Sequence, residues 1–167
     1  GTFAQKIVIN EKAVAKVPEY LSDQEAAAVP LTALTAMQAF QLLNLKAGQT
    51  LFISGGSGSF GAMAIPLAIT QGYKVITTGN ETSRARLEKL GVEKFLNYKT
   101  EDYTKAVANV DAVIDTVGGE ETVKQLSILK NSGEIVSLKG LPNREFAKRM
   151  NMGLAKELLF NVAARKI

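Results

Sequence analysis

A glycine-rich segment at residues 55–61, GGSGSFG, has the clearest chemical meaning in the sequence. It follows an apolar run at residues 50–54 and precedes small apolar residues, an order typical of a strand, a turn and a helix. Gly56, Gly58 and Gly61 give the spacing G-x-G-x-x-G. We expect these three to allow, respectively, a tight turn, a close approach of a diphosphate, and tight helix–strand packing. N–H groups at the start of the helix would then bind the diphosphate without a cationic side chain.

Two alternatives apply to the same loop. A glycine turn that binds nothing is the simpler one, but the position between a predicted strand and a predicted helix favours a binding loop. A nucleoside-triphosphate loop would need Lys followed by Ser or Thr after the last glycine, whereas Ala62, Met63 and Ala64 follow Gly61. The loop therefore predicts a dinucleotide site.

The end of the second predicted strand bears on which dinucleotide would bind. NAD sites commonly have an Asp or Glu there for the ribose hydroxyls, but Thr78 and Asn80 occupy this stretch, and Glu81 comes only in the following turn. Ser83 and Arg84 open the next helix, and a small polar loop with one arginine suits a 2′-phosphate. NADP(H) is therefore the expected cofactor, and the four residues other than Glu81 are candidate contacts. The alternative is that the two arginines of this helix belong only to a solvated face.

The elements around these residues alternate between strands and helices. Strands are expected at 50–54, 74–78, 94–98, 110–117 and 133–138, and helices at 21–45, 58–71, 83–90, 100–109 and 120–130. The 21–45 helix should begin with a capping box at Ser22 and Glu25 and be divided by Pro30. Apolar strands separated by helices predict an α/β fold with a doubly wound parallel sheet, the Rossmann fold. Residues 1–17 are expected to give one or two short strands.

The order of several segments resembles the medium-chain dehydrogenase/reductase superfamily, in its zinc-free quinone oxidoreductase-like branch. The segments are GTFAQKIVI, LSDQEAAAVPLTALTA, GGSGSFG, DTVGGE and SGEIVSLKG, and they span nearly the whole chain. The resemblance implies the end of an N-terminal catalytic lobe at 1–20, a Rossmann domain at 21–145, and a helical segment at 146–167 leading to a C-terminal part. It also implies an oxidoreductase that transfers hydride from NADPH to a quinone, enone or related carbonyl substrate.

The same resemblance implies roles for individual positions. Gly58, Ser59 and Phe60 correspond to diphosphate contacts, and Arg84 to the Lys or Arg that binds a 2′-phosphate. The other implied contacts are Thr35, Val117 and Leu138 near the nicotinamide end and Tyr98 near the adenosine end. The loop departs from the usual A-x-G-G-V-G because Ser59 and Phe60 replace Gly-Val, and the bulky Phe60 could narrow the pocket.

Simpler roles are open for several of these side chains. Thr35 could fill a helix junction, and Tyr98 could be a strand-end aromatic residue packed on the core. We interpret Asp115 as a strand-end residue that accepts hydrogen bonds from nearby backbone N–H groups rather than as an acid. Leu31 stands where zinc-using relatives carry a cysteine ligand, which argues against catalytic zinc. We expect the catalytic residues to lie outside this chain.

Composition excludes several function classes. The 167 residues include no Cys and no His, so the chain offers no thiolate, no imidazole base and no zinc site of its own. The net charge of +4 is dispersed, so a nucleic-acid partner is not expected. No apolar run reaches the roughly 20 residues that span a bilayer, so we expect no membrane partner and a cytoplasmic location.

The chain is expected to be a fragment, because it opens on Gly1 and stops inside the helix-like NVAARKI. Residues after Gly140 suit an amphipathic helix. The expected partners are a nicotinamide dinucleotide and a small-molecule substrate, and the resemblance allows a homodimer through the sheet edge. Two other functions are open: a non-catalytic nucleotide-binding or redox-sensing module, and a methyltransferase, which the missing acid after the second strand disfavours.

Overall fold

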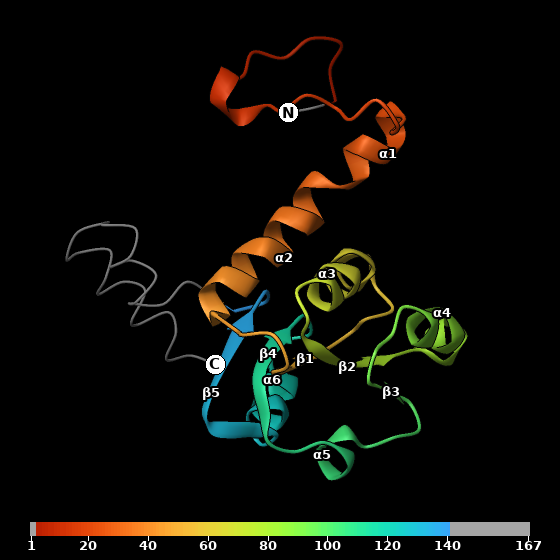
Figure 1. Ribbon diagram of the computed structural model, residues 1–167, viewed down its shortest axis with the longest axis vertical. Coiled ribbons are helices and arrows are strands. Elements are labelled where there is room, and N and C mark those ends of the chain that lie inside the picture. The colour runs from red at the N-terminus through yellow and green to blue at the C-terminus, as the bar shows by residue number, and fades with distance from the viewer. Residues whose placement is uncertain (1–2, 141–167) are drawn as a thin grey trace, which may run out of the picture.

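The computed structural model describes residues 3–140. Its centre is a parallel five-stranded sheet in the order β3-β2-β1-β4-β5, with helices on both faces (Figure 1). The strands are β1 (Thr50–Ile53), β2 (Lys74–Gly79), β3 (Lys94–Asn97), β4 (Val110–Asp115) and β5 (Leu129–Ser137). This topology confirms the predicted doubly wound α/β fold.

The described part also has six α-helices and two short 3-10 turns, of which η1, α1 and α2 precede the first strand. The helices are α1 (Asp23–Ala28), α2 (Pro30–Leu43), α3 (Ser59–Thr70), α4 (Arg84–Lys89), α5 (Tyr103–Ala106) and α6 (Glu120–Leu126), and the turns are η1 (Glu11–Ala13) and η2 (Glu81–Ser83). The capping box of Ser22 and Glu25 is present at the start of α1, as predicted. Pro30 is the first residue of α2, where its missing N–H costs no helix hydrogen bond.

Alternate side chains of each strand fill two separate hydrophobic clusters. In β1, Leu51 and Ile53 pack in the cluster formed with α2, α3 and α4, whereas Phe52 packs in the cluster that contains Tyr103 and Ile128. This alternation follows from the two-residue period of a strand. Because both clusters are buried, the register of β1 is fixed, and so is the point at which its chain leaves the sheet.

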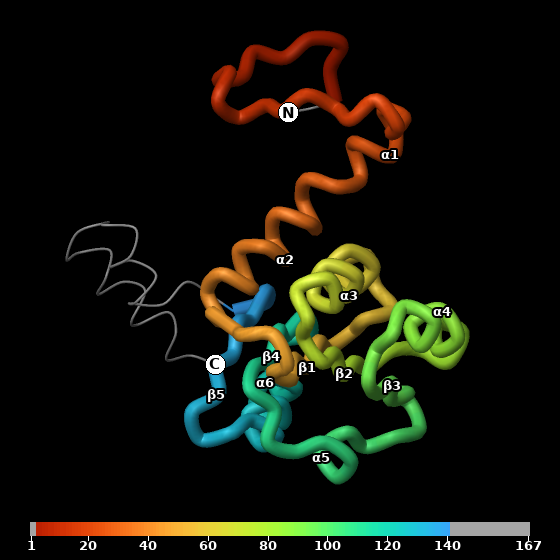
Figure 2. Tube along the Cα trace, viewed as in Figure 1, coloured from red at the N-terminus to blue at the C-terminus, as the bar shows by residue number. Residues whose placement is uncertain are grey.

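The N-terminal prediction was wrong for the part that the structure describes. Residues 3–22 contain no strand; η1 is their only assigned element. The segment lies at the end of α2 that is farther from the sheet (Figure 2), and residues 3–20 are exposed. Its alternating pattern has no strand beside it, and a strand without a neighbour leaves its N–H and C=O groups without ladder partners.

The predicted elements also differ around α5 and α6. Helix α5 has only four residues, and α6 ends at Leu126, so β5 begins at Leu129 instead of 133. The early part of β5 pairs Leu129 with Val110, and a register shift then brings Glu134 opposite Ala112. Residues 129 and 130, which a local pattern assigned to a helix, are therefore part of a strand because they pair with β4. The helix expected at 146–167 lies outside the described residues.

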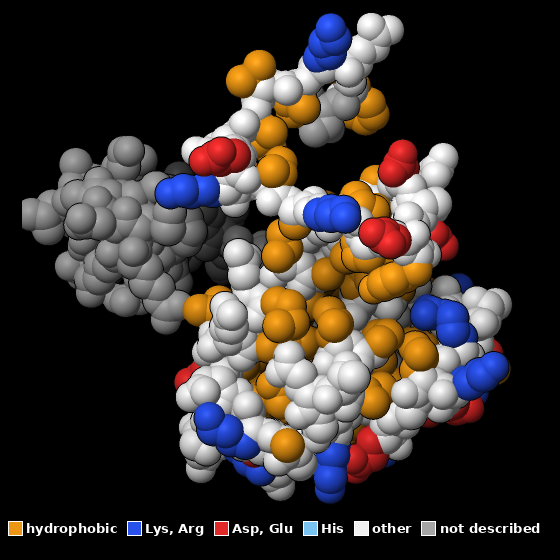
Figure 3. Space-filling model, turned by 45° about the horizontal axis from the view of Figure 1, so that its top comes forward, with side chains coloured by type: hydrophobic (Ala, Val, Ile, Leu, Met, Phe, Trp, Pro, Cys, Tyr) orange, Lys and Arg blue, Asp and Glu red, His pale blue; other side chains and the backbone are white. Residues whose placement is uncertain are grey.

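The surface has an apolar face. Hydrophobic side chains gather on the side of the molecule shown in Figure 3, and acidic and basic side chains lie mostly around them. The exposed apolar residues of α2 include Leu31, Leu34 and Leu42. None of the helices in residues 3–140 is long and apolar enough to cross a membrane.

Candidate functional site

The glycine loop connects the carboxyl end of β1 to α3. Gly55 has φ of 69°, the left-handed region that glycine enters without strain. The positive φ of the turn therefore falls on Gly55 rather than on Gly56, to which we had assigned the tight turn. The Gly56 N–H donates to the Thr78 carbonyl at 2.7 Å, and the Gly58 N–H donates to the Gly55 carbonyl at 3.0 Å. The first bond fixes the loop against the end of β2, and the second closes the turn within the loop.

Gly61 holds helix α3 against this loop. A Cβ atom at Gly61 would lie 2.6 Å from the carbonyl carbon of Gly56, closer than two non-bonded carbon atoms can approach. A Cβ atom at Gly56 would in turn collide with the side chain of Thr77. Glycine at these two positions therefore lets α3 pack against the loop and the loop pack against β2. This agrees with the tight helix–strand packing predicted for Gly61.

The start of α3 leaves N–H groups without protein partners among the described residues. Its N-cap is Gly58, which has no side chain to accept from them, and the helix ladder begins with the Ala62 N–H donating to the Gly58 carbonyl. The N–H groups of Ser59, Phe60 and Gly61 belong to the first turn, where a helix offers no internal acceptor. Together with the helix dipole they make a site suited to an anion.

Polar residues at the end of β2 and just after it hold the glycine loop and the following turn in place. The Thr78 hydroxyl accepts from the Gly55 N–H at 3.1 Å. Asn80 is the cap of η2: its Oδ1 accepts from the Ser83 N–H at 3.1 Å and from the Ser83 hydroxyl at 2.7 Å. The Asn80 N–H lies 3.4 Å from the Ser57 hydroxyl oxygen, which accepts from it. Thr78, at the end of β2, and Asn80 and Ser83, in the turn that follows, therefore lie next to the glycine loop.

Arg84 lies at the same turn but is surrounded by carboxylates. Its guanidinium donates to both oxygens of Glu81, at 2.7 and 3.1 Å, and to Glu101 at 3.2 Å, while Glu88 lies 3.6 Å away. The guanidinium carbon lies 4.5 Å from the centre of the Phe95 ring. The bond to Glu81 is the main cause of the raised pKa of Arg84. A 2′-phosphate at this position would have to compete with these anions for the guanidinium.

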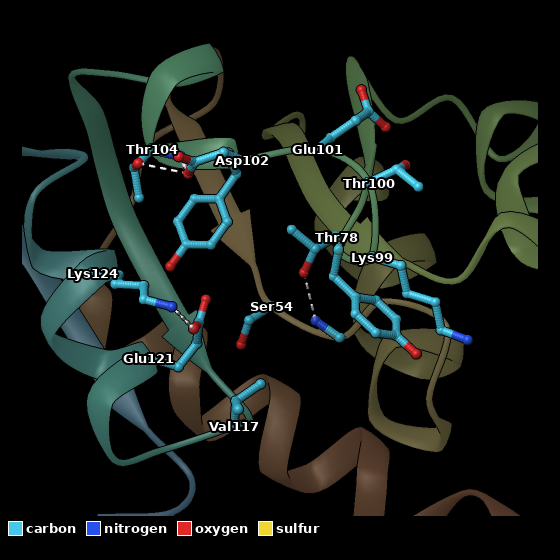
Figure 4. Close-up of a pocket in the computed structure, with 13 residues that line it drawn as sticks. Ser54, Thr78, Lys99, Thr100, Glu101, Asp102, Thr104, Val117, Glu121 and Lys124 are labelled. Atoms are coloured by element: carbon cyan, nitrogen blue, oxygen red, sulfur yellow. Dashed lines mark hydrogen bonds and ion pairs between the residues drawn. The ribbon is translucent and has the colours of Figure 1, made fainter.

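A pocket of about 780 Å³ opens beside the glycine loop, at the carboxyl ends of β1 and β2. Figure 4 shows Ser54 and Thr78 in its middle, with Glu121 and Lys124 on one side and Lys99 and Thr100 on the other. The lining residues are Ser54, Gly55, Thr78, Tyr98, Lys99, Thr100, Glu101, Asp102, Tyr103, Thr104, Val117, Glu121 and Lys124. Such a crevice outside the strand ends is where open α/β sheets bind ligands.

Three of the residues that we expected to contact a cofactor line this pocket: Thr78, Tyr98 and Val117. Thr35 and Leu138 do not. The Thr35 hydroxyl donates to the Leu31 carbonyl at 2.6 Å within α2, and Leu138 packs against the hydrophobic cluster. The segment from β3 into α5, and the segment from β4 into α6, contribute most of the wall, including Tyr103 and other residues that no motif singled out. The only feature of the sequence that could have predicted these lining residues is that they follow predicted strands.

Asp115 is fully buried at the end of β4 and accepts hydrogen bonds, as we predicted. The donors are the N–H groups of Val117 and Gly118 and the side chains of Thr122, Gln125 and Ser137, at 2.6–3.1 Å. Burial alone would raise the pKa of Asp115, but the bonds to the ionised form outweigh it and lower the pKa. The carboxylate holds the β4–α6 loop in place.

A family model described as zinc-binding dehydrogenase matches residues 60–162. The chain belongs to this family. It is 32% identical over 164 residues to the 2-methylene-furan-3-one reductase of Solanum lycopersicum, a match that covers 95% of this chain and 42% of that protein. Its position in the medium-chain dehydrogenase/reductase superfamily, near the quinone oxidoreductases, is therefore confirmed.

Solved structures of relatives have the same fold. The quinone oxidoreductase of Coxiella burnetii is 38% identical with a TM-score of 0.72, over 81% of this chain and 43% of that one. The quinone oxidoreductase of Thermus thermophilus, solved also in complex with NADPH, is 27% identical with a TM-score of 0.74, over 90% of this chain and 51% of that one. The chain thus spans about two fifths to one half of the length of these relatives.

The residues present fit a dinucleotide. The glycine loop and the uncapped start of α3 form a cradle of backbone N–H groups next to a pocket of ligand size. In the part of the chain that the structure describes, no group of three Cys, His, Asp or Glu residues could hold a metal ion.

Proposed function

We propose that the chain is the nicotinamide-dinucleotide-binding domain of an oxidoreductase that reduces a quinone, an enone or a related carbonyl compound with NADPH. The observation that carries the proposal is the uncapped first turn of α3, directly after the glycine loop and beside the pocket at the strand ends. Membership in the dehydrogenase family, and similarity to two quinone oxidoreductases, support the reaction class.

Each part of the dinucleotide would contact a different part of this site. The N–H groups of Ser59, Phe60 and Gly61 would bind the diphosphate, and the part of the pocket beside Tyr98 would take the adenosine end, with Val117 on the side of the nicotinamide. The nicotinamide end would extend toward the ends of β4 and β5. When bound, the cofactor supplies the hydride; the chain binds it, orients it and excludes water from its buried parts.

NADPH is proposed as the preferred cofactor, for two reasons. No carboxylate occupies the end of β2, where NAD sites commonly place one, because Thr78, Gly79 and Asn80 stand there. A relative of the same family was solved with NADPH. Arg84 is the proposed 2′-phosphate ligand, and it would exchange part of its contact with Glu81 for the phosphate.

Zinc-independent chemistry is part of the proposal. Leu31 occupies the position at which the resemblance places a cysteine ligand in zinc-using members. The Thr35 hydroxyl, one helical turn further along α2, is bonded to the Leu31 carbonyl. Hydride transfer would therefore depend on cofactor and substrate geometry without a Lewis acid.

The test is a fluorescence titration of the purified chain with NADPH and with NADH, before and after Arg84→Ala. NADPH is expected to bind more tightly to the original chain, and the substitution should reduce the difference by about tenfold, the effect of one charge-assisted hydrogen bond. Equal affinity for both cofactors before and after the substitution would contradict the 2′-phosphate assignment. No binding of either would contradict the dinucleotide site itself.

A further inference from the structure

Asp115 joins two segments of the chain that leave the sheet at its carboxyl edge. The first is the β4–α6 loop, whose Val117 and Gly118 N–H groups donate to Asp115 Oδ1 at 2.9 and 3.0 Å. The second is the end of β5, where the Ser137 hydroxyl donates to Oδ2 at 2.9 Å and the Leu138 N–H donates to the Asp115 carbonyl at 2.8 Å. One residue therefore fixes where the two segments lie relative to each other.

The two segments also contact each other directly. The register of β4 and β5 places Asp115 opposite Ser137, and the Lys139 N–H donates to the Ser137 hydroxyl oxygen at 3.2 Å. Gly118 has φ of 83°, and a Cβ atom there would lie 2.7 Å from the Cβ atom of Lys139. The turn at Gly118 and the end of β5 are therefore closely packed, and a displacement of one would move the other.

Helix α6 holds the carboxylate in its position between the two segments. Thr122 Oγ1 donates to Oδ2 at 2.6 Å, and Gln125 Nε2 donates to Oδ1 at 3.1 Å. A buried carboxylate is costly unless donors surround it, so these bonds keep it ionised and fix its orientation. Asp115 is fully buried and is not one of the residues that line the pocket. It can therefore act on a ligand only through the segments that it holds.

These segments lie on one half of the crevice at the strand ends. Strand β1 is central, with β2 and β3 on one side and β4 and β5 on the other, so the switch point of the sheet lies between β1 and β4. Dinucleotides bind across such a point. Val117 is 54% exposed and lies at the edge of the pocket (Figure 4). A dinucleotide with its diphosphate at α3 and its adenosine beside Tyr98 therefore has its nicotinamide half next to the segments after β4 and β5.

We infer that Asp115 and Ser137 are positioning residues for the nicotinamide half of the dinucleotide, because they hold the β4–α6 loop and the end of β5 at the spacing that this half needs. Both act through the segments that they join. The inference rests on the proposed function, since it assumes that the dinucleotide binds here. It adds that the nicotinamide half depends on a hydrogen-bond network on which the adenosine half does not depend.

The experiment measures the affinities of the purified chain for NADPH and for 2′-phospho-ADP-ribose by isothermal titration calorimetry. The second ligand has the adenosine and diphosphate of NADPH but no nicotinamide. In Ser137→Ala the affinity for NADPH should fall about three- to tenfold, the effect of one lost hydrogen bond, while that for 2′-phospho-ADP-ribose should change by less than about twofold. A general loss of structure would lower both affinities together.

The outcomes separate the inference from the proposed function. An equal loss for both ligands, or no loss for NADPH, would overturn the inference and leave the proposed function intact. Failure of the unsubstituted chain to bind NADPH would contradict the proposed function and the inference with it.

Three further variants test whether the carboxylate transmits the effect. Thr122→Val keeps the shape of the side chain but removes the other hydroxyl that donates to Oδ2 of Asp115, and it should also weaken NADPH binding selectively. Ser137→Thr keeps the hydroxyl group and should bind both ligands as the original chain does. Ser132→Ala is the matched control, because Ser132 is exposed on the same strand, and it should leave both affinities unchanged. A selective loss in Ser137→Ala that Ser137→Thr shares, or that Thr122→Val lacks, would overturn the inference.

Discussion

Arg84 illustrates how the neighbours of a side chain decide what it can bind. From the sequence, Arg84 was the single cation expected at the 2′-phosphate. In the structure its guanidinium forms ion pairs with Glu81 and Glu101 and lies over the Phe95 ring. A phosphate therefore gains contact with Arg84 only to the extent that these carboxylates release it. Cofactor preference at this turn depends on Glu81 as well as on Arg84.

Replacing Glu81 with glutamine should increase the preference for NADPH over NADH by about two- to fivefold, the effect of one exposed ion pair. The amide keeps a bond acceptor for the Asn97 side chain, which now donates to Glu81 at 3.1 Å, while the repulsive charge is removed. The ratio of the two dissociation constants is the measurement. Glu134→Gln, on β5, removes the same charge from an exposed position and should leave the ratio unchanged. A lower preference in Glu81→Gln would show that the carboxylate orients Arg84 for the phosphate.

Asp115 gives a prediction about stability. Asp115→Asn should lower the free energy of unfolding by about 2–4 kcal/mol, because an amide cannot accept from all five donors and buried groups lose partners. Since the folded pKa lies below the unfolded value of about 3.9, the carboxylate stabilises the fold above that pH, and this contribution is lost as the pH falls toward the folded pKa. Urea unfolding at pH 7 and pH 3 should therefore show a smaller difference between the two proteins at pH 3. A difference independent of pH would contradict the role of the charge.

At the scale of the elements, the N-terminus of helix α3 shows how a cap residue affects ligand binding. Natural helices usually place Ser, Thr, Asp or Asn at the N-cap, and here Gly58 takes that position. A side chain at this cap would occupy the N–H groups that the proposed diphosphate needs. The glycine therefore gives up a stabilising cap and leaves the groups available to a ligand.

Gly58→Asp should separate these two roles. The aspartate can cap α3, but its Cβ would lie 3.3 Å from the Gly55 carbonyl oxygen, so the free energy of unfolding should change by no more than about 1 kcal/mol relative to glycine. Its charge takes the same N–H groups and repels a diphosphate, so NADPH affinity should fall about 100-fold or more. Gly140→Asp adds the same charge where the nearest atom to a new Cβ is 3.6 Å away, and should bind NADPH normally. NADPH binding that survives Gly58→Asp would place the diphosphate elsewhere.

The sequence predicted elements well where local and long-range signals agreed. The Ser22 capping box, the break at Pro30 and the five strands could all be predicted, because short apolar runs and caps are local features. The N-terminal strands and the 127–130 end of α6 could not, since they depend on which segment pairs with the chain in space. For the same reason, sequence patterns identified Thr78 and Val117 in the pocket but not Tyr103 or Glu121.

For the whole molecule, the distribution of exposed apolar surface bears on what the chain can do alone. Leu31 is 80% exposed and Leu34 is 62% exposed, on the same helix whose Phe40 and Leu43 are buried. Helix α2 therefore packs on the sheet through one end and one side and leaves apolar side chains uncovered. The match to this chain covers only 42% of the tomato reductase and 43% of the Coxiella quinone oxidoreductase, so both relatives are more than twice as long as the matched region.

We expect the purified chain to bind NADPH but to reduce quinones poorly. Hydride transfer needs a substrate held in contact with the nicotinamide and shielded from water, and this positioning supplies much of an enzyme's rate. The described residues form a pocket at the strand ends beside the uncapped start of α3, whereas the surface of α2 toward Leu31 and Leu34 is open to solvent. NADPH oxidation in the presence of a quinone should therefore be at least about a thousandfold slower than a typical enzyme turnover of about 10 per second. The measurement is NADPH absorbance at a saturating cofactor concentration, with Gly58→Asp as the blank for unbound cofactor. A turnover near the typical value, abolished in the blank, would show that this chain contains a substrate site and catalytic groups of its own.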